Sequence, residues 1–131
     1  MKLLDLKLRM MVMWIWTAIG MTATLVFILL DPARLEKIMS KIEALGPSWH
    51  IIGPLFGLIP LIMAFLTITL KERANRLTNR ILSIIYTALV LADFVQMLLE
   101  PAAYQIIIVG SVVVAAAYII FYSWKWPIEK T

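Results

Sequence analysis

The stretch "MMVMWIWTAIGMTATLVFILL", residues 10–30, contains no charged side chain. At ~1.5 Å of rise per residue, a helix of this length crosses the ~30 Å hydrocarbon layer of a bilayer. The apolar region of a signal peptide is shorter, about 7 to 15 residues. No small-x-small cleavage pattern follows residues 10–30 either. We therefore predict that this stretch is a first membrane span.

Three more apolar stretches of similar length follow it. They cover residues 49–70, 81–100 and 102–124. These runs are continuous, whereas the strands of a membrane β-barrel alternate apolar and polar residues. Of the 131 residues, 63% are hydrophobic and only 15% are charged, against about 25% in an average soluble domain. The sequence predicts an all-α integral membrane four-helix bundle that forms one domain over residues 1–131.

The segment between the first two predicted spans has the signals of a short helix. Asp31 can cap its start, and Pro32 suits its first position. Gly46 can adopt the left-handed conformation after the last turn, and Pro47 prevents continuation. The apolar residues share one face: Leu35, Ile38, Met39, Ile42 and Leu45. We predict an amphipathic interfacial helix over residues 32–45, which is either a strap that closes the connection or a lid or partner-docking helix.

Basic residues are distributed unevenly among the connections. Nine Lys and Arg lie in the two terminal tails and in residues 71–80, against three in residues 31–48. Because cytoplasmic segments carry the excess of Lys and Arg, we expect a protein of the cell membrane with both termini in the cytoplasm. The formal charge of +4 is then a topology signal, and nucleic-acid binding is not expected. Aromatic residues gather near the same predicted interface: Trp14, Trp16, Tyr122, Trp124 and Trp126.

The second predicted span contains residues that disturb a helix or allow close packing: Gly53, Pro54, Gly57 and Pro60. Each proline removes a backbone donor and tends to bend the helix. The two glycines form a small-xxx-small pair that lets another helix approach closely. The resulting kink is either a hinge, an opening to a cavity, or a plain packing feature.

Several chemistries have no residues to support them. The chain has no cysteine and a single histidine, His50. Thiolate chemistry and disulfides are therefore excluded, and one chain cannot supply a three-histidine zinc site or a two-histidine haem site. Glycine-rich phosphate loops and zinc-protease motifs are also missing from the sequence. We expect neither enzyme activity nor a metal or cofactor.

An acidic residue interrupts the third predicted span, in "LVLADFVQMLLEP", residues 89–101. At ~100° per residue, one arc of roughly 120° contains the residues Tyr86, Val90, Asp93, Gln96, Met97 and Glu100. An unpaired charge near the bilayer centre costs at least ~2.5 kcal/mol. We therefore expect this polar stripe to face the bundle or another subunit.

Three residues are candidate partners of Asp93 by their depth: His50, Thr22 and Thr24. The spans contain no lysine or arginine that could form an ion pair with it. Asp93 is then either a proton or cation site entered from outside, or a neutral acid that fastens helices through a hydrogen bond to Thr or Tyr.

Two segments, "LIPLIMAFLTITLKERANRLTNRILSIIYT" and "FYSWKWP", resemble a family of small bacterial and archaeal membrane proteins, domain-of-unknown-function family 6326. The positions that carry the resemblance are Pro60, Thr69 to Lys71, Ala74 to Arg76, and Tyr122 to Pro127. The resemblance implies a four-helix integral membrane protein and supplies no activity. Members often carry an acid in the first helix, where "MTATLVF" has none.

Two classes of function fit these features. The first is a small oligomeric transporter or channel-like protein that uses the polar stripe. The second is a non-catalytic scaffold or accessory subunit whose stripe and amphipathic helix bind partner helices. The expected partners are the lipid bilayer, further copies of the chain and a partner membrane protein.

Overall fold

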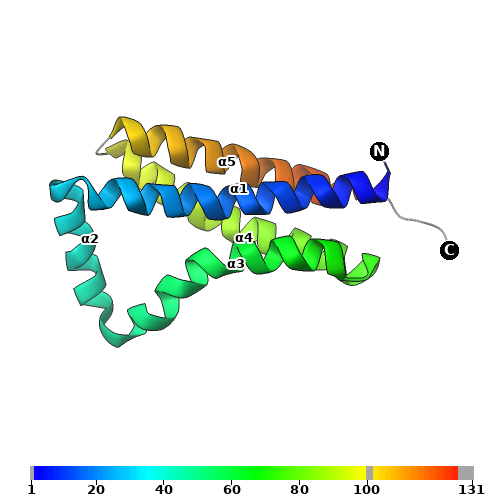
Figure 1. Cartoon of the computed structure of the whole chain (residues 1–131), viewed down its shortest axis with the longest axis horizontal. Coiled ribbons are helices and arrows are strands. Elements are labelled where there is room, and N and C mark those ends of the chain that lie inside the picture. Colours follow the sequence, from blue (N-terminus) through cyan, green and yellow to red (C-terminus); the bar gives the residue numbers. More distant parts are fainter. Residues whose placement is uncertain (1, 100–101, 127–131) are drawn as a thin grey trace.

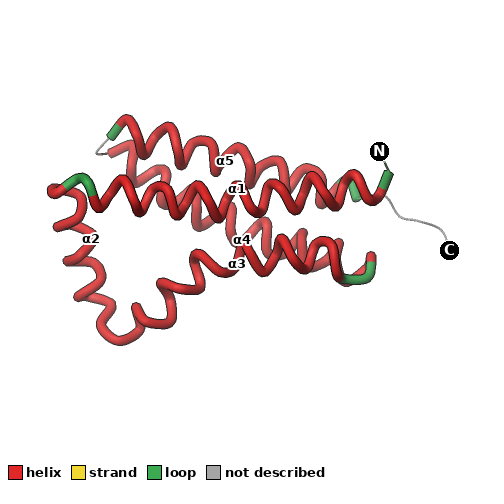
Figure 2. Tube along the Cα trace, in the orientation of Figure 1, coloured by secondary structure: helices red, strands yellow, loops and turns green. Residues whose placement is uncertain are grey.

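The computed structural model describes residues 2–99 and 102–126, except for the side chain of Phe56. Four long helices form a bundle, and a shorter helix lies across one end of it (Figure 1). Short connections join the helices, and the described residues contain no strand (Figure 2). The helices are α1 (Leu3–Leu29), α2 (Pro32–Leu45), the 3₁₀ turn η1 (Gly46–Ser48), α3 (Trp49–Thr69), α4 (Glu72–Leu99) and α5 (Ala103–Trp124).

The predicted all-α four-helix bundle is confirmed. The chain has four helical segments that are long and apolar enough to cross a membrane by their length and composition. In a bilayer such segments must be helical, because no water reaches the hydrocarbon layer to pair with their backbone groups. The chain is therefore an integral membrane protein with a lipid environment around its apolar helices.

The amphipathic helix α2 has the predicted bounds and ends. Asp31 Oδ1 accepts a hydrogen bond from the Arg34 backbone N–H at 3.5 Å, so Asp31 caps the helix. Gly46 has a φ of +60°, which glycine adopts without the steric cost that a Cβ brings. One end of α2 joins α1 and the other joins α3, so the helix spans the distance between them (Figure 1).

Two helices are longer than the membrane spans predicted within them. α1 begins at Leu3, before the predicted span 10–30, and α4 begins at Glu72, before the predicted span 81–100. The segment expected as a loop over residues 71–80 is therefore almost entirely helical. Lys, Glu, Arg, Ala and Leu are good helix formers in water as well as in lipid, so both helices continue past the apolar runs.

The four long helices do not all pack equally against their neighbours. α1 packs against both α3 and α5, and α5 packs against α4, whereas α3 and α4 make little contact with each other. The start of α1, the end of α5 and the α3–α4 connection all lie at one end of the bundle, here called the terminal end (Figure 1). The opposite end carries α2 and is here called the α2 end.

α3 changes direction near its middle (Figure 1). Pro54 and Pro60 both lie inside this helix, where each removes a backbone donor. Among the described α3 side chains, the buried ones begin at Pro60 and continue with Met63, Ala64 and Thr67. The first half of α3 therefore diverges from the bundle, and only its second half packs against α1.

A close approach of two helices occurs at Gly20, to which the sequence analysis assigned no role. A Cβ added at Gly20 would collide with Val112 Cγ2, so α1 and α5 approach too closely for any other residue there. At Gly57 an added Cβ would meet nothing within 4 Å, and at Gly53 it would meet only Trp49 of the same helix. Within the described chain no other helix packs at Gly53 or Gly57, because this half of α3 has left the bundle, so their packing role stays a prediction.

Candidate functional site

The predicted polar stripe of α4 is only partly directed inward. Tyr86 is buried, Asp93 is half-buried and Gln96 is exposed. Glu100 lies outside the described residues. The arc chosen from the sequence is wider than the face that α4 buries in one chain, so Gln96 does not face the bundle, and the alternative that it faces another subunit stays a prediction.

The direction in which Asp93 leaves α4 follows from a comparison with Asn75 of the same helix. Asp93 follows Asn75 by 18 residues, which at ~100° per residue is about five full turns. Both side chains therefore leave α4 on the same face. Asn75 Nδ2 donates to the Thr67 carbonyl of α3 at 2.6 Å, so this face is directed toward α3. Toward the α2 end, however, the first half of α3 bends away from the bundle (Figure 1).

The carboxyl group of Asp93 consequently faces the side on which α3 and α4 separate. Among residues 2–99 and 102–126 it makes no hydrogen bond and no close ion pair. Lys41 of α2 lies near enough for its positive charge to act on this carboxyl group. The predicted spans contain no lysine or arginine. The cation near Asp93 is instead Lys41 of α2, the helix that crosses the α2 end.

None of the three predicted partners binds Asp93. The hydroxyl groups of Thr22 and Thr24 donate to carbonyls of their own helix, at Ala18 (2.9 Å) and Gly20 (3.0 Å). Threonine in a helix commonly satisfies its hydroxyl in this way, which removes the need for a partner on another helix. His50 is exposed at the start of α3.

A second polar group, which the sequence analysis did not identify, lies near the terminal end and is completely buried. Asn75 and Asn79 of α4 are each 0% exposed. Asn79 Oδ1 accepts from Trp14 Nε1 at 2.9 Å and from Thr67 Oγ1 at 3.3 Å. Asn79 Nδ2 donates to Asn75 Oδ1 at 2.7 Å and to the Asn75 carbonyl at 3.0 Å. We call these four side chains the amide network.

The amide network connects three helices: Trp14 comes from α1, Thr67 from α3, and the two asparagines from α4. All four side chains have partners, which is the condition under which buried polar groups stabilise a fold. Trp14 is thus a core residue and not an interfacial anchor, since it is only 1% exposed. The signal in the sequence was the spacing of Asn75 and Asn79, which places both on one helix face.

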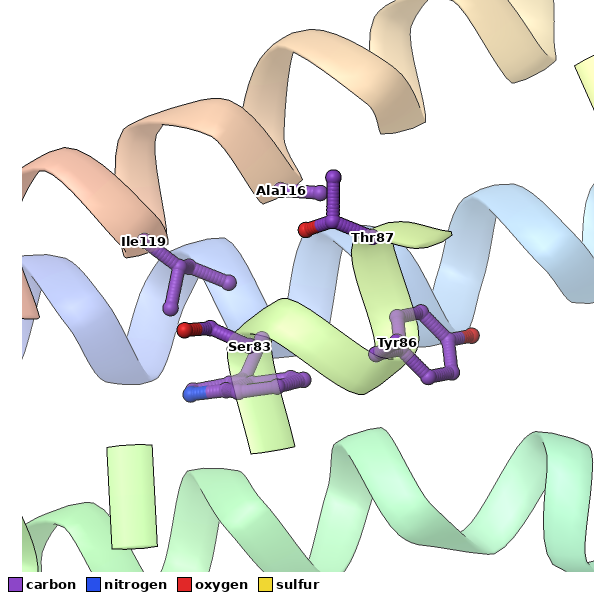
Figure 3. Close-up of a pocket in the computed structure, with 6 residues that line it drawn as sticks. Ser83, Tyr86, Thr87, Ala116 and Ile119 are labelled. Carbon is purple, nitrogen blue, oxygen red and sulfur yellow. The ribbon is translucent and has the colours of Figure 1, made fainter. Parts of the chain in front are cut away.

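The centre of the bundle contains a small pocket between α1, α4 and α5 (Figure 3). Its lining includes Ser83, Tyr86 and Thr87, yet its space is too narrow for a water molecule. The Tyr86 hydroxyl points away from Ser83 and Thr87 (Figure 3). Polar groups do not converge on a common point, so this pocket is a packing gap and offers no ligand site.

The terminal end of α5 is held by Arg80 of α4. Its Nε donates to the Ser123 carbonyl at 2.9 Å, and a second guanidinium nitrogen donates to the Trp124 carbonyl at 3.3 Å. The guanidinium also lies over the Trp124 ring, 4.6 Å from its centroid. A cation at a helix C-terminus interacts favourably with the last carbonyls, so Arg80 fixes α5 to α4 at this end.

Comparison with known proteins gives no match to a family model, a curated protein or a solved structure. The resemblance to family 6326 therefore stays a prediction. Within the described part of the chain, no three His, Asp or Glu side chains gather where they could hold a metal ion. The candidate site is Asp93, on the side of α4 from which the first half of α3 diverges.

Proposed function

We propose that this chain is a small transporter or channel-like protein of the cell membrane, in which Asp93 binds a proton or a cation. The observation that supports this most strongly is the half-buried Asp93 carboxyl on the side where α3 and α4 separate, without a hydrogen-bond partner in the described chain. A structural acid would be expected to hold a partner, because an unsatisfied polar group within a membrane costs free energy.

The route to Asp93 leads from the α2 end. With both termini in the cytoplasm, as the Lys and Arg distribution predicts, this end faces the outside. We further propose that the protein is an oligomer. One chain leaves the α3–α4 side open, and a second copy would supply the missing wall of a path past Asp93.

Flux measurements in liposomes test this proposal. The wild-type protein should carry protons or monovalent cations, and Asp93→Asn should reduce this flux to that of empty liposomes. Asparagine keeps the size of the side chain but cannot bind or release a proton at neutral pH. Glu43→Gln is the matched control, because it removes an exposed carboxylate from α2 at the end of the bundle from which Asp93 is reached. Its flux should equal that of the wild type.

Two results would contradict the proposal. The first is an Asp93→Asn variant that transports as well as the wild type. The second is a wild-type protein that gives no flux of protons, monovalent cations or small solutes.

One observation favours the scaffold function as the second candidate. Gln96 exposes an amide on the surface of α4, where lipid cannot satisfy its hydrogen bonds but a partner helix can. That function predicts co-purification with one membrane protein in mild detergent, and Gln96→Leu should weaken the association. Recovery of the chain without a partner would argue against it.

A further inference from the structure

An apolar groove follows the surface of α1 beside α5. It is lined by Val12, Ile15, Trp16, Ile19 and Gly20. Trp16 Nε1 donates to Ser111 Oγ of α5 at 3.3 Å, which places the indole between the two helices. The groove is open to its surroundings and offers about 340 Å³ of space, where about 10–15 Å³ in the same measure holds one water. Its walls are almost wholly apolar, so it suits a hydrocarbon chain.

Arg9 lies just beyond the groove, on its side toward the terminal end of the bundle. Arg9 precedes Val12 and Trp16 by three and seven residues, so it lies on the same face of α1. Its guanidinium is close to Tyr118 and Tyr122 of α5. The two tyrosine rings stack with their centroids 4.3 Å apart.

A second cation flanks the same aromatic surface. Lys125 Nζ lies 4.2 Å from the centroid of the Phe121 ring. The Phe121 ring in turn meets Tyr122, with centroids 5.3 Å apart. Tyr118, Phe121, Tyr122 and Lys125 are spaced as residues on one face of a helix. Asp5 is the acidic side chain whose charge acts on Arg9, so it partly offsets the positive charge there.

We propose that this α1–α5 surface binds an anionic phospholipid. Its phosphate lies between Arg9 and Lys125, and one acyl chain lies in the groove lined by Val12, Trp16 and Ile19. The guanidinium can donate two hydrogen bonds to a phosphate, and the tyrosines suit the level of the headgroups. A cation at one end of an apolar groove matches an amphiphile, whereas a free anion would gain nothing from the groove. Basic surfaces next to membrane helices are known to select anionic lipids.

Native mass spectrometry of the detergent-purified protein measures this binding directly. The protein is titrated with phosphatidylglycerol or phosphatidylcholine of the same acyl chains, and the bound copies are counted. The wild type should retain phosphatidylglycerol more strongly. Arg9→Gln and Lys125→Gln should each weaken its binding about fivefold, with little effect on phosphatidylcholine. Arg9→Lys keeps the charge, so it should weaken phosphatidylglycerol binding less than Arg9→Gln does.

Three further variants separate a built site from general surface charge. Arg73→Gln removes an exposed cation from α4 at the same end and should leave lipid binding unchanged. Asp5→Asn should strengthen phosphatidylglycerol binding, because it removes the acid that acts on Arg9. Val12→Trp should fill the groove and weaken binding of both lipids.

Two outcomes would overturn the proposal. One is equal weakening by Arg9→Gln and Arg73→Gln, which would mean diffuse charge attraction. The other is equal retention of the two lipids by the wild type. Thermal unfolding of each variant in the same detergent, with a midpoint like that of the wild type, shows that the comparison is made on folded protein.

Discussion

Replacing Asn79 by alanine is expected to lower the free energy of unfolding by about 2–4 kcal/mol, which is the larger of the two stability losses predicted for this chain. The substitution leaves Trp14 Nε1 and Asn75 Oδ1 without their partner inside a region that water does not reach. Each unsatisfied buried group costs about 1–3 kcal/mol. Thermal unfolding in mild detergent, followed by size-exclusion chromatography of heated samples, measures the change as a lower midpoint.

The adjacent residue provides the control. Thr78 is half-buried and belongs to the same turn of α4, but its side chain takes no part in the amide network. Thr78→Ala should change the midpoint little. Asn79→Asp keeps an acceptor for Trp14, but its carboxyl group must stay protonated to donate to Asn75, so it should also lower the midpoint, and more at higher pH. If Asn79→Ala were as stable as Thr78→Ala, the amide network would not hold α1, α3 and α4 together.

The second large effect is expected at Gly20. Gly20→Ala places a methyl group against Val112, whose branched side chain has little freedom to move aside, so α1 and α5 must separate. Overpacking of this kind costs about 1–3 kcal/mol. Gly57→Ala is the matched control, because a methyl group there meets nothing within 4 Å. It should leave stability equal or raise it by up to ~1 kcal/mol, since alanine favours the helix.

A double variant shows whether the cost at Gly20 arises from Val112. Val112→Ala removes the atom that the new methyl group would meet. Combined with Gly20→Ala, it should therefore lose less stability than the sum of the two single variants. Strict additivity, or a Gly57→Ala variant as unstable as Gly20→Ala, would contradict the close approach of α1 and α5.

Local sequence signals were sufficient for the helices. The continuous apolar runs predict four long helices because a bilayer accepts little else, and the bounds of α2 follow from Asp31, Pro32 and Gly46. These signals depend on neighbouring residues alone. The extensions of α1 and α4 beyond the predicted spans were not foreseen, since charged residues such as Glu72 and Arg73 end an apolar run although they favour a helix.

Contacts between residues far apart in the sequence could not be predicted from local patterns. Asn79 is buried because α1 brings Trp14 and α3 brings Thr67 to it, and neither is near it in the sequence. Gly20 matters because Val112 lies opposite, and Gly57 does not because α3 has bent away. For the same reason the sequence located Asp93 on a polar face of α4 but could not show that α3 leaves that face uncovered.

The central claim is that residue 93 is reached by water from the α2 end. The chain has no cysteine, so Asp93→Cys carries a single thiol. In sealed proteoliposomes, a membrane-impermeant thiol reagent should modify this thiol from the side on which α2 lies. Ala88→Cys, exposed on α4 away from α3, should face lipid and stay unmodified. Failure to modify residue 93 from either side, or equal modification of residues 88 and 93, would contradict the claim.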